Sequence, residues 1–287
     1  MSVRRAILRD FVYVCSMILE KTKEIVRRAA VLMVDRDFAV EQKDGCANIV
    51  TSSDLAVQEF LCRELAALIP GCGFICEEGD LSGPRKPAEG DEDNQECVWV
   101  IDPIDGTCNY SRGCGDCAIS VALKKGPEVV LGVVYSPSRG ELYWAEKGRG
   151  AFCNGKPLRA SKRPFEDAIL CTAMSTYRKE FAAVCSDIIM DAYYQCNDLR
   201  RFGVASLELC FLAAGQFELY FEMRLQPWDY AAAMLILQEA GGTITNLEGK
   251  TPRFDGPDLV CAASGPENHA RLLGIIRSHL KEIPYTD

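Results

Sequence analysis

The chain has 287 residues, of which 48% are hydrophobic and 25% charged, and it carries a formal net charge of -9 at pH 7. These values are typical of a soluble globular protein with a substantial core. The acidic balance argues against nucleic acid or an anionic membrane as the main partner, although bound metal ions would still permit an anionic substrate. The 15 cysteines are odd in number and scattered, which favours reduced thiols in a cytoplasmic protein over a disulfide framework. We find no secretory signal pattern and no apolar run long enough for a membrane span.

Hydrophobic periodicity predicts a mixed chain of helices and strands. We expect helices at 3–34, 52–70, 179–190, 204–214, 229–239 and 266–280, and strands at 73–76, 98–101, 169–172, 217–222, 243–245 and 259–263, with a run of antiparallel strands between 118 and 153. Two polar segments, 41–48 and 79–96, are predicted to be a mobile loop and a solvated loop. The sequence contains no repeat and no clear linker, so we expect one layered domain over 1–287, with an N-terminal lobe of about 1–155 and a C-terminal lobe of about 156–287.

The rest of the chain is organised around the ten residues VWVIDPIDGT, numbers 98–107. The apolar half predicts a buried strand that ends at Pro103, because proline cannot continue a central strand. Asp102 and Asp105 are close enough for both carboxylates to face one point, and Thr107 is a good N-cap for a short helix. Such a turn suits a hard cation that holds a phosphate. An acidic surface turn explains the same residues equally well.

Further acidic residues stand where strands end or helices begin. They are Asp54, the pair Glu77 and Glu78, and Asp229 after Trp228. Each one alone is explained by the helix dipole, but adjacent like charges after a buried strand call for a compensating cation. The only two histidines, His269 and His279, both lie in the last predicted helix, so a carboxylate and metal route is favoured over a histidine base.

Three segments, taken together, resemble the signature of the inositol monophosphatase family, and the resemblance runs from Lys43 to the end of the chain. They are Cys76-Glu77-Glu78, Asp102-Pro103-Ile104-Asp105-Gly106-Thr107 and Trp228-Asp229-Tyr230-Ala231-Ala232. The resemblance implies an α+β fold, a layered αβαβα sandwich, usually in a homodimer. It also implies a Mg²⁺-dependent, lithium-sensitive phosphatase.

The resemblance implies a metal centre of two or three Mg²⁺ ions. Glu77, Asp102 and the backbone carbonyl of Ile104 would hold the first ion, and Asp102, Asp105 and Asp229 the second. A third, weaker ion would be held by Glu77 and waters. Mn²⁺ is expected to substitute for Mg²⁺, whereas Ca²⁺ and Li⁺ are expected to inhibit.

The resemblance also assigns the catalytic residues, which are Thr107, Asp54 and Glu77. Thr107 would pair with Asp54 to orient and deprotonate the attacking water. The backbone amides of Gly106 and Thr107 would bind the phosphate.

On the substrate side, the resemblance points to Glu222, Ala205, Gln226 and Arg224, and to Lys43 on a mobile loop. Glu222 matches a residue that accepts a hydrogen bond from a substrate hydroxyl, and Ala205 falls on the backbone beside it. Gln226 and Arg224 depart from the family pattern, which commonly has His and a small residue there. Arg224 is compatible with a second phosphate or carboxylate on the substrate, or with an outward-facing surface position. Lys43 matches a basic residue that helps to hold a metal-bound water or the phosphate, and a solvated lysine explains it equally well.

The expected function is therefore a phosphomonoesterase for a small polyol phosphate, with inositol monophosphate as the default substrate. Fructose-1,6-bisphosphatase or 3'-phosphoadenosine 5'-phosphate phosphatase activity is the alternative on the same scaffold. From a different class, a regulatory binding protein with incidental catalysis remains open. A redox role for Cys114 and Cys117 would need a lowered thiol pKa.

Overall fold

The structure of the protein is a computed structural model that describes residues 2–33, 39–43, 49–79, 97–176 and 178–280, with side chains from residue 16 onward. Two segments for which the sequence predicts loops, 44–48 and 80–96, lie outside the described residues. Within the described ranges, no helix is both long and apolar enough to span a membrane.

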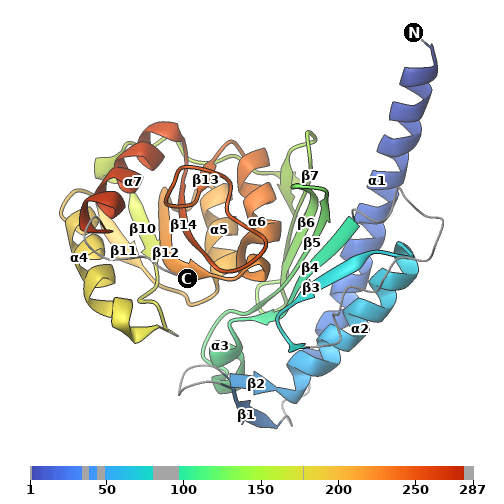
Figure 1. Cartoon of the computed structure of the whole chain (residues 1–287), viewed down its shortest axis with the longest axis horizontal. Coiled ribbons are helices and arrows are strands. Elements are labelled where there is room, and N and C mark those ends of the chain that lie inside the picture. The colour runs from blue at the N-terminus through green and yellow to red at the C-terminus, as the bar shows by residue number, and fades with distance from the viewer. Residues whose placement is uncertain (1, 34–38, 44–48, 80–96, 177, 281–287) are drawn as a thin grey trace.

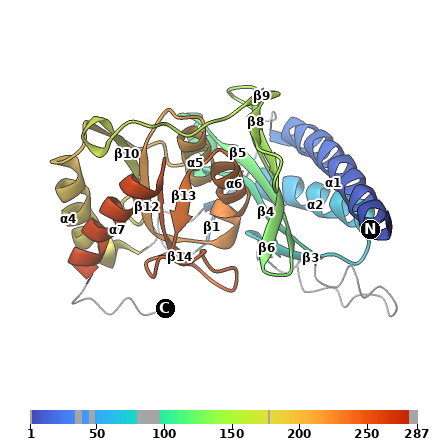
Figure 2. The same cartoon turned by 90° about the horizontal axis from the view of Figure 1, so that it is seen from above.

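Helices and sheets alternate in an αβαβα order, which confirms the predicted fold class (Figures 1 and 2). The outer helices on one side are α1 (Ser2–Ala29) and α2 (Ser52–Leu68), the central helices are α5 (Ala205–Ala213) and α6 (Pro227–Glu239), and the outer helices on the other side are α4 (Ala182–Tyr193) and α7 (Pro266–Leu280). The central pair is apolar around most of its circumference, as expected of helices buried between two sheets.

Among the described residues, the first sheet has seven strands that follow each other in chain order. They are β3 (Gly73–Cys76), β4 (Cys97–Asp105), β5 (Ala118–Lys125), β6 (Glu128–Ser136), β7 (Glu141–Glu146), β8 (Ala151–Cys153) and β9 (Lys156–Pro157). Only β3 and β4 pair in parallel, and the others are antiparallel. The predicted antiparallel run between 118 and 153 is thus confirmed.

The second sheet has five strands in the order β11-β10-β12-β14-β13. They are β10 (Ile169–Thr172), β11 (Asp198–Arg200), β12 (Leu219–Leu225), β13 (Thr243–Thr245) and β14 (Asp258–Ala263). β10 pairs in parallel with both of its neighbours, while β14 pairs antiparallel with β12 and β13. The first sheet ends at Pro157 and the second sheet begins at Ile169. The division of the chain into two lobes stays a prediction.

Short elements complete the described chain. They are η1 (Ala30–Met33), β1 (Val40–Gln42), β2 (Ile49–Thr51), α3 (Thr107–Arg112), η3 (Phe165–Asp167) and η4 (Lys179–Phe181). β1 and β2 form an antiparallel pair in which Glu41 lies opposite Val50. The prediction of a loop beginning at Glu41 is therefore wrong for Glu41 and Gln42. These residues form a strand only through hydrogen bonds to β2, and neither strand has the alternation of apolar and polar residues that would reveal it in the sequence.

The central helices lie very close to the first sheet. A Cβ atom added to Gly132 in β6 would stand 2.5 Å from the carbonyl oxygen of Ala232 in α6, so glycine is needed for this approach. Helix α6 also contacts β13 of the second sheet. The same helix layer thus belongs to the cores of both sheets.

All thirteen cysteines whose side chains the structure describes are free thiols. The Sγ atoms of Cys62 and Cys76 are 3.7 Å apart. Cys114 is exposed and Cys117 is buried, and burial raises the pKa of Cys117 to about 12. That direction is opposite to what a reactive thiol needs.

Candidate active site

The end of β4 carries the two aspartates of the central motif. Asp102 lies opposite Ser120 and Asp105 opposite Ala118, so β4 has one extra residue relative to β5. In a regular strand, residues three apart point to opposite faces, and this bulge brings both carboxylates to one face. The prediction that the strand ends at Pro103 is wrong, because a bulge accommodates a residue without an N–H.

Thr107 is the first residue of α3, and Gly106 is the N-cap, with φ 87°. The prediction of Thr107 as the N-cap is therefore wrong. A Cβ atom at position 106 would stand 2.8 Å from Cγ2 of Val204, so both the conformation and the space require glycine. Because it does not cap the helix, the Thr107 hydroxyl lies 2.9 Å from the Ile104 carbonyl oxygen and 3.3 Å from Oδ1 of Asp54.

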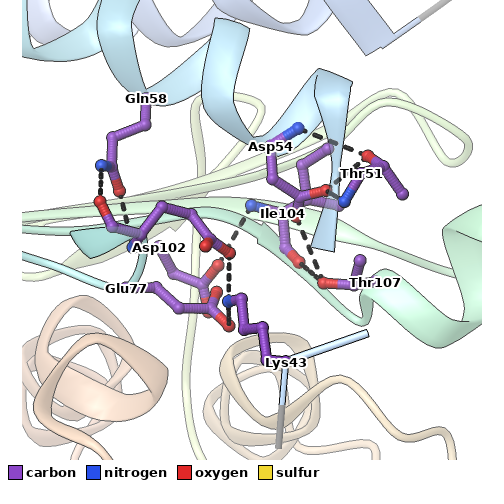
Figure 3. Close-up of polar contacts among 9 residues, drawn as sticks. Lys43, Thr51, Asp54, Gln58, Glu77, Asp102, Ile104 and Thr107 are labelled. Carbon is purple, nitrogen blue, oxygen red and sulfur yellow. Dashed lines mark hydrogen bonds and ion pairs between the residues drawn. The ribbon is translucent and has the colours of Figure 1, made fainter. Parts of the chain in front are cut away.

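Asp54 is held at the start of α2 by a capping box with Thr51. Its Oδ2 atom accepts a hydrogen bond of 2.8 Å from the Thr51 amide and another from the Thr51 hydroxyl, which leaves Oδ1 directed at Thr107 (Figure 3). Asp54 is fully buried. Burial raises the pKa of Asp54, while the hydrogen bonds from Thr51 and Thr107 oppose that rise.

The Glu77 and Glu78 pair follows β3 and is fixed by a residue that sequence reasoning missed. The Gln58 side chain, buried on α2, donates to the Glu78 carbonyl oxygen and accepts from the Glu78 amide at 3.0 Å. Lys43, at the end of β1, places its Nζ atom 2.5 Å from Oε1 of Glu78 and 3.4 Å from Oε1 of Glu77 (Figure 3). The signal for Gln58 is a polar residue three positions before Leu61, on the apolar stripe of α2.

The two central helices begin at the same site. Oδ2 of Asp105 accepts a hydrogen bond of 2.7 Å from the Ser206 amide in the first turn of α5, beside Ala205. Asp229 lies in the first turn of α6 and accepts 2.7 Å from the Gln226 amide. Both carboxylates therefore lie at the positive ends of helix dipoles.

The carboxylates interact strongly with one another. Burial raises the pKa of Asp102 well above its usual range, and the charges of Glu77, Asp105 and Asp229 raise it further. Burial also raises the pKa of Glu77 to about 7 and that of Asp105 to about 6. Such a cluster, made only of oxygen donors, suits a hard cation such as Mg²⁺.

Glu77 and Asp102 are in direct contact, because their side chains share a hydrogen bond. Within the described residues, no group of three or more His, Cys, Asp or Glu side chains stands as a ready metal site. Lys43 supplies positive charge beside Glu77, which lowers the pKa of that carboxyl against the effect of burial.

A cavity of about 270 Å³ adjoins the cluster. Its walls are formed by Lys43, Glu77, Ser175, Thr176, Arg178, Glu222, Arg224, Leu225, Gln226, Trp228 and Asp229. The cavity thus brings residues expected at the metal centre together with those expected at the substrate, whereas Ala205 is not among its lining residues. Sequence reasoning missed the wall from Ser175 to Arg178, which has no distinguishing pattern.

Glu222 and Glu208 add two more acidic groups near the cavity. Oε2 of Glu222 accepts a hydrogen bond of 2.8 Å from the Tyr220 hydroxyl, and burial raises the pKa of Glu222 to about 8. Oε1 of Glu208 accepts from the amides of Phe202 and Gly203 at 2.7 and 2.8 Å. Sequence reasoning missed Glu208, although an acidic residue inside an apolar helix was a visible signal.

Comparison with known proteins places this geometry in a family. The inositol monophosphatase family matches residues 10–281. The chain is 35% identical to the inositol-1-monophosphatase of Caulobacter vibrioides over 240 residues, which cover 82% of this chain and 90% of that protein. It is 36% identical to the Nus factor SuhB of Escherichia coli (strain K12) over 215 residues, 74% of this chain and 77% of that protein.

A solved structure agrees with the sequence comparison. The extragenic suppressor protein suhB of Bartonella henselae superposes with a TM-score of 0.80 at 29% identity, and the match covers 91% of this chain and 98% of that one. The chain therefore belongs to the inositol monophosphatase family of phosphatases.

Proposed function

We propose that the protein is a Mg²⁺-dependent phosphomonoesterase that hydrolyses a small phosphorylated polyol, with inositol monophosphate as the first candidate. The observation that carries the proposal is the cluster of carboxylates at the bulge of β4, next to the Thr107 and Asp54 pair. Phosphate monoesters are dianions that resist attack by water, so an oxygen-rich cation site beside a proton acceptor is the arrangement this reaction needs.

Five groups on this chain are suited to hold the ions. We assign Glu77, Asp102 and the Ile104 carbonyl to one ion, and Asp102, Asp105 and Asp229 to the other. Bound Mg²⁺ would neutralise phosphate charge and lower the pKa of a coordinated water. The Ile104 amide donates 3.0 Å to Oδ1 of Asp102 and so orients that carboxylate.

Thr107 and Asp54 are suited to move the proton. The Thr107 hydroxyl can accept a hydrogen bond from the attacking water while it donates to Oδ1 of Asp54. The water proton then passes to the Thr107 oxygen as the hydroxyl proton passes to Asp54. The amides of Gly106 and Thr107 are assigned to the phosphate oxygens.

The wall away from the acidic cluster is suited to recognise the alcohol. Glu222 and Gln226 line the cavity and offer hydrogen bonds to hydroxyl groups. Fructose 1,6-bisphosphate and 3'-phosphoadenosine 5'-phosphate are the alternative substrates on this scaffold.

A regulatory binding role is the second candidate function. It is favoured by relatives named Nus factor SuhB, which are as similar to this chain as the relatives named inositol-1-monophosphatase. The two candidates differ in whether the carboxylate cluster is required.

The decisive experiment measures phosphate release with and without Mg²⁺ from inositol 1-phosphate, fructose 1,6-bisphosphate, 3'-phosphoadenosine 5'-phosphate and glycerol 2-phosphate. Asp102→Asn removes a shared ligand, and Asp187→Asn is the matched control because Asp187 is exposed on α4. We expect Mg²⁺-dependent release that Asp102→Asn abolishes and Asp187→Asn preserves. Release that ignores Mg²⁺, or that survives in Asp102→Asn, would contradict the assignment of the metal centre.

Other ions extend the same assay. We expect Mn²⁺ to replace Mg²⁺ and Ca²⁺ and Li⁺ to inhibit. Lithium inhibition is supported by a staphylococcal inositol monophosphatase, 25% identical to this chain, that was solved as an inhibitory complex after soaking in lithium chloride.

A further inference from the structure

The cavity beside the carboxylate cluster has a basic wall that the proposed reaction does not use. Strand β12 brings Glu222 and Arg224 to the cavity, and Gln226 follows as the N-cap of α6. Residues two apart in a strand share a face, and a register shift between Glu222 and Leu225 bends the strand at this point. An arginine is thereby placed among residues that line the same space as Glu77 and Asp229.

The guanidinium of Arg224 has N–H groups that are available to a ligand. Arg224 is half-buried, and in the described part of the chain its guanidinium makes no hydrogen bond or ion pair. Its charge acts on Glu180, which is exposed and already paired with Arg178. A guanidinium offers five N–H donors in a planar fork that matches phosphate and carboxylate groups.

A second arginine reaches the cavity from a strained turn. Ser175 is buried, with 4% of its surface exposed, and has φ 42°, a conformation that is uncommon for residues other than glycine. The Arg178 amide donates 3.2 Å to the Ser175 carbonyl and closes this turn, so that Thr176 and Arg178 line the cavity. Strain of this kind persists where the surrounding structure requires it, often at ligand sites.

We propose that Arg224, with Arg178, selects phosphate monoesters that carry a second anionic group, a phosphate or a carboxylate, beyond the phosphate that is hydrolysed. This inference rests on the proposed function. The acidic end of the cavity suits only a phosphate accompanied by cations, whereas the arginine wall attracts an anion directly. A neutral polyol leaves the Arg224 guanidinium without a partner, and a second anionic group forms charge-assisted hydrogen bonds with it.

The test compares substrates that differ only in the second group. One pair is fructose 1,6-bisphosphate and fructose 1-phosphate, and the other is 2-phosphoglycerate and glycerol 2-phosphate. The kcat/KM ratio within each pair is measured for the wild type, Arg224→Met and Arg178→Met. Lys179→Met is the matched control, because it removes the same charge from an exposed neighbour that does not line the cavity.

We expect the wild type to favour the doubly anionic member of at least one pair, and Arg224→Met to lower that ratio by about tenfold or more. Arg178→Met should lower it less, because Arg178 is shared with Glu180, and Lys179→Met should leave it unchanged. A response in the fructose pair alone identifies the second group as phosphate, and a response in both pairs includes carboxylates. An equal ratio in wild type and Arg224→Met overturns the proposal.

Binding separates failure of this inference from failure of the proposed reaction. Calorimetry gives the dissociation constants of fructose 1,6-bisphosphate and fructose 1-phosphate for wild type and Arg224→Met, whether or not either compound is hydrolysed. Absence of turnover in the wild type would defeat the proposed function, while a preference for the bisphosphate lost in Arg224→Met would still support the anion-selecting wall. Equal affinities in both proteins would reject it.

Discussion

The hydroxyl of Thr107 has one proton and two acceptors, the Ile104 carbonyl at 2.9 Å and Asp54 at 3.3 Å. The hydroxyl can exchange one acceptor for the other at little cost in free energy, because both oxygens lie within hydrogen-bond distance. Activation of water uses only the Asp54 contact. We therefore expect Thr107→Val, which has nearly the same shape, to lower kcat by about 10² to 10⁴-fold. Thr107→Ser should retain most of the rate, because it keeps the hydroxyl. Steady-state kinetics at saturating Mg²⁺ decide this, and equal rates for Val and Ser at position 107 would exclude a role of the hydroxyl.

Glu208 predicts a pH dependence of stability. Burial raises the pKa of Glu208 to about 7, above its ordinary 4.5. The folded protein therefore binds this proton more tightly than the unfolded chain, and stability is lost as pH rises from about 4.5 to about 7. Glu208→Gln keeps an oxygen for the Phe202 and Gly203 amides and removes the titration.

Between pH 4.5 and pH 7, we expect the unfolding free energy of the wild type to fall by roughly 3 kcal/mol relative to that of Glu208→Gln. Urea unfolding at several pH values in the presence of a chelator measures it. Glu59→Gln, on an exposed face of α2, serves as the control. Parallel pH profiles for Glu208→Gln and wild type would contradict the burial argument.

At the scale of elements, the turn after β3 depends on α2. Gln58 satisfies both the amide and the carbonyl of Glu78, so Gln58→Ala leaves two buried backbone groups without partners and loosens the adjacent Glu77. We expect a loss of about 2 kcal/mol or more in stability and about 10 to 100-fold in Mg²⁺ affinity. Thermal unfolding and Mg²⁺ titration of activity measure the two effects, and Glu59→Ala on the same helix should change neither. An unchanged Mg²⁺ affinity in Gln58→Ala would show that the turn is positioned without it.

Elements with a long period or a clear terminal signal could be predicted from the sequence. Helix α7 begins at Pro266 as predicted and continues to Leu280, the last described residue, because proline at its start and an apolar period of 3.6 define it. The strands β1, β2 and β11 could not be predicted, since a segment of three residues has no period and exists only through its partner. β13 is equally short, but it could be predicted because Gly241 and Gly242 mark the end of the preceding helix.

Only part of the candidate site could be predicted from the sequence. Local motifs indicated the acidic residues of β4 and α6, but the bulge at Pro103 depends on pairing with β5, which is not local. The turn from Ser175 to Arg178 reaches the cavity only because the second sheet packs against the central helices that also cover the first sheet, so its sequence alone gave no indication.

For the whole molecule, the central helices bind the two sheets into one unit. The Glu239 carboxylate at the end of α6 accepts hydrogen bonds of 2.7 and 2.8 Å from the amides of Gly148 and Gly150. Asn109 donates 2.8 Å to the carbonyl of Phe202. We therefore expect the two predicted lobes to unfold in a single transition, with equal calorimetric and van't Hoff enthalpies. Differential scanning calorimetry of the metal-free protein tests this, and two resolved transitions would mean that the lobes fold separately.

The acidic cluster is drawn from segments that are far apart along the chain, from Glu77 after β3 to Asp229 at the start of α6. During translation, the stretch that separates them takes on the order of ten seconds or more to synthesise. Until α5 and α6 leave the ribosome, the nascent chain carries Asp102 and Asp105 without the start of α5, which holds Asp105, and without Asp229 at the start of α6. The complete set of carboxylates therefore comes into being only as the last third of the chain emerges, and a prematurely terminated product has no assembled site.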